Sequence, residues 1–94
     1  MILKNRVAEV REAAGLSVYE LCARAGLFST SGQIVSRSVV LMEEGKNPNI
    51  QLALKVFLVL KETGKVETFE ELFWLEGFDV QQNLEALKAA RKNS

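Results

Sequence analysis

Glycines divide this chain into short segments in which apolar residues recur every three or four positions. That spacing places apolar side chains on one face of an α-helix, and glycine commonly follows a helix C-terminus. The chain contains six glycines and one proline, which suits helices joined by short turns. The pattern therefore predicts an all-α fold of five to six helices.

Two helices are predicted in the first third of the chain. The first ends at Gly15, and the second starts at Ser17, with Glu20 completing a capping box three residues later. Gly26 ends the second helix. The apolar face of the first helix comprises Leu3, Val7, Val10 and Ala14, and that of the second comprises Val18, Leu21, Cys22 and Ala25.

The rest of the chain predicts a loop and four more helices. Residues 28–34 are mostly small and polar and predict the loop. A third helix over residues 36–44 ends at Gly45, and after the turn Asn47-Pro48-Asn49 a fourth runs from 50 to 63, capped by Asn49. A fifth starts at Thr68, where Glu71 offers a second capping box, and a last helix follows Gly77 and starts near Asp79. The residues expected to point inward are Val39, Met42, Phe69, Leu72 and Phe73, and the last helix carries an apolar stripe of Val80, Leu84 and Leu87.

The fourth expected helix is apolar on two sides and must be covered on both. One stripe comprises Ile50, Leu54 and Phe57, and the other comprises Leu52, Val56 and Val59. We expect the first stripe to pack on the three preceding helices. The second then requires either the C-terminal helix or a second subunit, and the C-terminal stripe is itself either core or dimer seam.

Length and composition indicate one domain. At 94 residues and 48% hydrophobic residues, the chain can bury a single core without disulfides or metal. We expect residues 1–76 to form the functional domain and residues 77–94 to form a helical extension within the same globular unit. No apolar run is long enough to cross a bilayer, so we expect a cytoplasmic protein without membrane association.

Several kinds of chemistry have no candidate residues. The chain has no histidine, and its one cysteine, Cys22, has no partner for an internal disulfide. Neither a nucleophile–base pair nor a phosphate-binding loop is visible. We therefore expect no catalytic residues, no metal, no cofactor and no enzymatic activity.

The net charge of zero counts mildly against nucleic-acid binding, because 12 basic residues balance 12 acidic ones. The distribution is uneven, however. Much of the acidic excess lies after residue 60, whereas the first half of the chain is slightly basic. The chain could thus turn a near-neutral to basic face toward DNA and an acidic face away from it.

The order of several short segments resembles the phage-repressor family (Cro-like, XRE-type) of helix-turn-helix DNA-binding proteins. The resemblance covers residues 3–73 and rests on the segments Asn5–Arg11, Gly15–Ser17, Glu20–Cys22, Glu43–Pro48, Ala53–Val56 and Glu70–Phe73. It implies a lambda-repressor-like helix-turn-helix domain, to which a C-terminal helix is added. In that family one helix crosses the DNA backbone and the next inserts its N-terminal residues into the major groove.

The resemblance also assigns individual residues. Cys22 matches a small alanine at the helix crossing, and Arg11 with Glu43 matches a structural salt bridge. The positions that contact DNA are carried over as Ser36, Arg37, Ser38, Val40, Leu41, Lys46 and Asn47. Arg37 could contact a guanine edge, a phosphate or only solvent; Ser36 could be a contact or simply the helix cap. Val40 and Leu41 could touch thymine methyl groups or pack on the preceding loop.

Two departures from the family pattern affect the docking geometry. Val18 stands where the family has a phosphate-binding glutamine, and about seven extra residues separate the two central helices. The third helix could therefore start earlier, with Ser31 as its cap, and direct Gln33 and Arg37 toward DNA.

Three functions fit these features. The first is a transcriptional regulator, a repressor, that binds double-stranded operator DNA as a homodimer, since one helix contacts only a few base pairs. The second is an antitoxin that binds DNA and a toxin protein. The third is a protein-interaction module that keeps the fold and has lost DNA binding.

Overall fold

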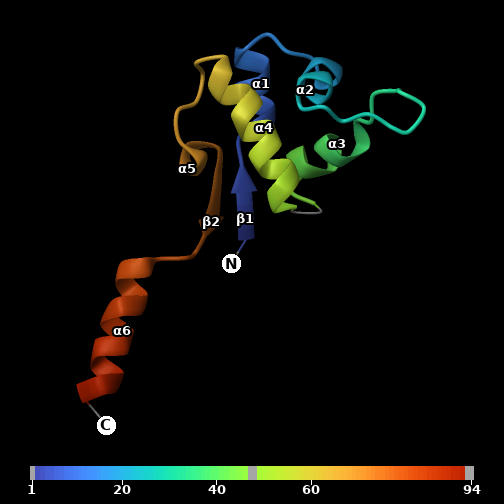
Figure 1. Cartoon of the computed structure of the whole chain (residues 1–94). Coiled ribbons are helices and arrows are strands. Elements are labelled where there is room, and N and C mark those ends of the chain that lie inside the picture. The colour runs from blue at the N-terminus through green and yellow to red at the C-terminus, as the bar shows by residue number, and fades with distance from the viewer. Residues whose placement is uncertain (1, 47–48, 93–94) are drawn as a thin grey trace.

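The computed structural model describes residues 2–46 and 49–92 and is mostly helical (Figure 1). The expectation of an all-α chain is confirmed in part: the chain is mostly helical, but the two segments flanking the helical body pair as a small antiparallel sheet. The elements in chain order are β1 (Ile2–Asn5), α1 (Val7–Ala13), α2 (Val18–Arg24), α3 (Arg37–Glu43), α4 (Ile50–Glu62), α5 (Phe69–Leu72), β2 (Phe73–Glu76) and α6 (Val80–Lys92).

The sheet replaces the start of the first expected helix. β1 pairs with β2 in a register that sets Leu3 opposite Leu75 and Asn5 opposite Phe73. Helix α1 begins only at Val7, where the Asn5 side chain accepts a hydrogen bond from the Val7 amide at 3.1 Å. The placement of Leu3 in a helix was wrong because its backbone pairs with a strand about seventy residues away, which local periodicity cannot reveal.

The local signals around α2 are confirmed. The Ser17 hydroxyl accepts a hydrogen bond from the Glu20 amide at 3.1 Å, and the Glu20 carboxylate accepts one from the Ser17 amide at 3.5 Å. Gly26, with φ of 72°, follows the helix, and the next amide, of Leu27, donates to the Cys22 carbonyl. This left-handed backbone is the usual helix ending that glycine permits.

The core lies between the helices and one face of the sheet. Its fully buried side chains are Val7, Leu21, Cys22, Val39, Val56, Leu60 and Leu72. These side chains come from α1, α2, α3, α4 and α5. With Phe73 of β2 they belong to one core. As expected, Val39 and Met42 of α3 and Leu72 and Phe73 near the sheet point inward.

Helix α4 buries most of the stripe that was expected to need other cover. Leu52 and Val56 are buried against the core, whereas Ile50 and Leu54 of the other stripe are exposed, as is Leu58; only Phe57 of that other stripe is buried as expected. The assignment was wrong because α4 contacts α1, α2 and α5, so the stripe that seemed to need the C-terminal helix is covered without it. The uncovered apolar stripe is Ile50–Leu54–Leu58.

Helix α6 extends away from the rest of the chain (Figure 1). Every one of its residues is exposed, including Val80, Leu84 and Leu87. Residues 77–92 therefore do not join the core of the single chain, although we expected them to belong to the same globular unit. The Asp79 side chain caps α6 by accepting hydrogen bonds from the Gln81 and Gln82 amides at 2.9 and 3.2 Å.

Candidate nucleic-acid interface

The candidate interface consists of α2, α3 and the twelve-residue connection between them. Helices α2 and α3 contact each other, and α3 is anchored by Val39 and Met42. The exposed face of α3 carries Arg37, Ser38 and Val40. Arg37 is the first residue of the helix, so its side chain stands at the end of α3 that follows the connection.

The connection is an ordered hairpin rather than an irregular loop. Phe28 and Ile34 form an antiparallel bridge, and the Ser29 amide donates to the Gln33 carbonyl at 2.8 Å. The Ser29 hydroxyl accepts from the Gln33 amide at 3.2 Å and lies 2.9 Å from that of Ser31. The extra residues thus form a defined protrusion beside α3 (Figure 1). In the sequence, the only signal for this bridge is that two apolar residues, Phe28 and Ile34, flank a short polar segment.

Helix α3 starts only after this hairpin. Ser31 lies in the hairpin, and α3 begins at Arg37, so the alternative in which Ser31 caps a longer third helix is wrong. Ser36 occupies the N-cap position of α3, but its side chain makes no capping hydrogen bond there. Gln33 is exposed in the hairpin and lies outside any helix.

The remaining candidate residues differ in their surroundings. Leu41 is half-buried, whereas Val40 is 40% exposed. Ser38 lines a groove between the hairpin and the start of α4, where it is joined by Lys55. Lys46 is exposed and pairs with Glu44 at 3.5 Å, and Asn47 lies outside the described residues.

The charge of this region was not recognised from the sequence alone. No carboxylate occurs between Glu20 and Glu43, although the chain has 12 acidic residues. The same span contains two exposed cations, Arg24 at the end of α2 and Arg37. The carboxylates of α2, the hairpin and α3 are therefore confined to Glu20, in the first turn of α2, and Glu43, which is paired with Arg11. A polyanion approaching Arg24, the hairpin or Arg37 meets no negative side chain from residues 21–42.

A salt bridge fixes the end of α3 to α1. The Arg11 Nε lies 3.2 Å from both carboxylate oxygens of Glu43, and Nη1 of Arg11 donates to the Leu16 carbonyl at 2.9 Å. The two side chains are only 13% and 11% exposed. A second tie is the Asn5 amide group, which donates to the Met42 carbonyl at 2.8 Å. Together these contacts hold α3 in one orientation on the core.

Two residues at the helix crossing are explained by packing. Cys22 is fully buried, and burial, together with the nearby Glu43 carboxylate, raises the pKa of its thiol. Val18, the first residue of α2, is half-buried and packs against the core. Among the described residues no group of three or more potential ligands could hold a metal ion, and no helix there is long and apolar enough to cross a bilayer.

Comparison of the chain with protein-family models, with curated proteins and with solved structures finds no match in any of the three.

Proposed function

We propose that this chain is a sequence-specific DNA-binding regulator of the phage-repressor helix-turn-helix class, acting in the cytoplasm as a repressor. In this proposal it binds an operator as a homodimer, with α3 as the recognition helix. The observation that carries the proposal is the outer face of α3: Arg37, Ser38 and Val40 are exposed on a helix held by a largely buried salt bridge, within a span, residues 21–42, that is free of carboxylates.

The chemistry of that face suits duplex DNA. An arginine at the start of an inserted helix can bond to the O6 and N7 atoms of guanine, and an aliphatic side chain such as Val40 can contact a thymine methyl group. Hydroxyl groups of Ser38 and of the hairpin can donate to phosphates, which position the protein without selecting a sequence. Catalysis has no place in this proposal.

The test begins with selection of duplexes from a random library, followed by fluorescence anisotropy with the selected duplex and a scrambled one. We expect specific binding at least about a thousandfold tighter than scrambled binding, and weakening as salt rises. The variant Arg37→Ala should lose about 1–3 kcal/mol of binding free energy. The charge-matched control Lys65→Ala, in the turn after α4, should bind like the parent chain.

Equal and weak binding to every duplex would contradict the proposal. Equal losses for Arg37→Ala and Lys65→Ala would contradict the assignment of α3, because only overall charge would then matter.

A further inference from the structure

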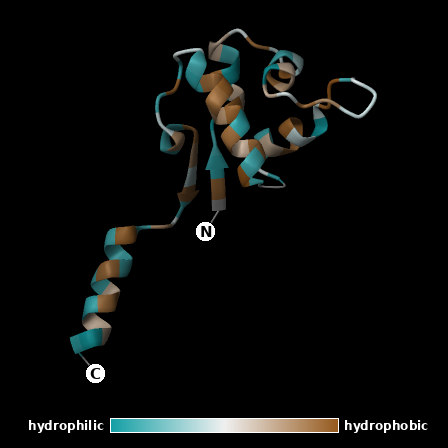
Figure 2. Cartoon of the chain, viewed as in Figure 1, coloured by the Kyte–Doolittle hydropathy of each residue, from teal (hydrophilic) through white to brown (hydrophobic). Residues whose placement is uncertain are grey.

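The structure leaves two apolar surfaces uncovered in the same chain. The first is the stripe of α6, with Val80, Leu84 and Leu87 exposed by 60%, 44% and 46%, and Phe78 just before it by 46%. Figure 2 shows hydrophobic and hydrophilic segments alternating along α6, which projects from the body. A 13-residue helix without a packed face is only marginally stable in water. We therefore expect another surface to cover the apolar stripe of α6.

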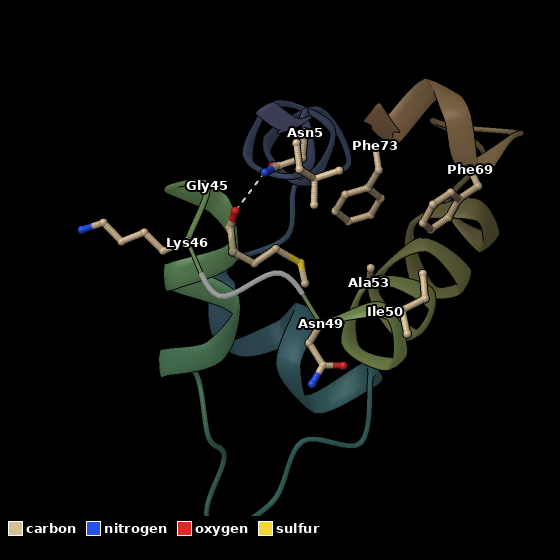
Figure 3. Close-up of a pocket in the computed structure, with 10 residues that line it drawn as sticks. Asn5, Gly45, Lys46, Asn49, Ile50, Ala53, Phe69 and Phe73 are labelled. Carbon is tan, nitrogen blue, oxygen red and sulfur yellow. Dashed lines mark hydrogen bonds between the residues drawn. The ribbon is translucent and has the colours of Figure 1, made fainter. Parts of the chain in front are cut away.

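The second surface is a groove of about 270 Å³ between the sheet and α4. Figure 3 shows Phe69 and Phe73 facing Ile50 and Ala53 across this groove, while Lys46 points away from it. Leu3 also lines the groove, and Leu75, opposite Leu3 in the sheet, extends the same face because side chains alternate along a strand. Through Ile50 the groove continues into the exposed α4 stripe Ile50–Leu54–Leu58.

Helix α6 of one chain leaves the sheet in a direction away from α4 (Figure 1). Leu3, Asn5 and Phe73 line the groove along the sheet, and α6 departs beyond the Ile2–Glu76 pair. The radius of gyration is 17.1 Å, well above the roughly 12 Å of a compact chain of this length. Reaching its own groove would require α6 to reverse direction between Gly77 and Asp79. A second copy can receive α6 with the backbone as it stands.

We propose that two copies exchange α6, so that Val80, Leu84 and Leu87 of each chain pack in the sheet–α4 groove of the other. Pairing of the two α6 helices alone would be too small. Each partner of a stable dimer buries about 800 Å². Val80, Leu84, Leu87 and Phe78 are 44–60% exposed, so even at about 250 Å² each they could bury no more than about 500 Å² together. The exchange also buries the sheet face and the α4 stripe. It buries them in both chains, because a two-fold interface repeats every contact.

This inference deepens the proposed homodimer by naming its surfaces, and its test uses no DNA, so its failure and that of DNA binding are distinguishable. Light scattering after size-exclusion chromatography should give a mass near twice the 10.5 kDa of the chain. Leu84→Glu in α6 and Ile50→Glu in the groove should each shift the mass to one chain. The matched controls Ala89→Glu, on the opposite face of α6, and Gln51→Glu, beside Ile50, should remain dimeric.

Cross-linking separates exchange from the other arrangements. Chains carrying Leu87→Cys are mixed with chains carrying Ile50→Cys and treated with a short bismaleimide; the native Cys22 is buried. We expect links between the two kinds of chain. Links only between Leu87→Cys chains would overturn the inference in favour of α6 pairing with α6. A link within one chain that carries both substitutions, together with a monomeric mass, would overturn it in favour of α6 folding back.

Discussion

The variant Glu43→Gln tests whether the salt bridge at the end of α3 stabilises the fold. The substitution keeps the size of the side chain and removes its charge, which leaves the 13% exposed Arg11 guanidinium with only the exposed carboxylate of Glu12, at 3.9 Å. Removing one partner of a fully buried ion pair costs about 3–5 kcal/mol. Some exposure remains, and Arg11 keeps its bond to the Leu16 carbonyl, so we expect a loss of about 2–3 kcal/mol.

The neighbouring residue provides a matched control. Glu44 pairs with Lys46 at 3.5 Å, but those side chains are 52% and 68% exposed. Because exposed ion pairs contribute little, Glu44→Gln should change stability by no more than about 0.5 kcal/mol.

Urea unfolding followed by circular dichroism, at one protein concentration, measures both variants. With an m value of about 1–1.5 kcal/mol/M, Glu43→Gln should lower the midpoint by roughly 2 M and Glu44→Gln by less than about 0.5 M. Equal midpoints for the two variants would refute the reasoning, because they would show that burial adds nothing to the Arg11–Glu43 pair.

Four further predictions concern α2 and α4. Ser17→Ala removes the capping oxygen of α2 and should cost about 1 kcal/mol in urea unfolding; no loss would mean that the capping box is not formed in solution. Leu60→Ala opens a cavity at a fully buried position and should cost about 2–5 kcal/mol, whereas Leu58→Ala, at a 58% exposed position of the same helix, should cost much less; similar losses would contradict the described face of α4. Iodoacetamide should modify Cys22 slowly in the folded chain and rapidly in urea, since burial raises its pKa; equal rates would contradict its burial. Because folding raises this pKa, Cys22 should also make the folded state less stable as the pH rises past the unfolded value of about 8.5.

What could be predicted from the sequence is the part that depends on neighbouring residues. Ser17 with Glu20, and Asn49 with the Leu52 amide, cap their helices by bonds that span three positions, so the residue types alone indicate them. Gly45 likewise ends α3 in a left-handed conformation, with φ of 81°. Thr68 and Ser36 are exceptions, because their side chains make no capping hydrogen bond.

The features that could not be predicted depend on residues far apart in the chain. Leu3 has the spacing of a helical residue, and only pairing with β2 places it in a strand. Which stripe of α4 is buried depends on where α1, α2 and α5 lie. The α6 stripe looks the same in the sequence whether it packs inside its own chain or outside it. In the candidate interface, the spacing of Val39 and Met42 indicated the buried side of α3, but the hairpin beside it arises from a bridge between Phe28 and Ile34.

The most direct test of the central proposal is an amide chemical-shift titration of the full chain with the duplex obtained by selection. The account predicts that the largest changes fall in residues 29–41, which comprise the hairpin and most of α3, with smaller changes at Lys46 and in α2. Saturable changes confined to other surfaces, or uniform small changes with every duplex tried, would contradict the proposal that α3 recognises DNA.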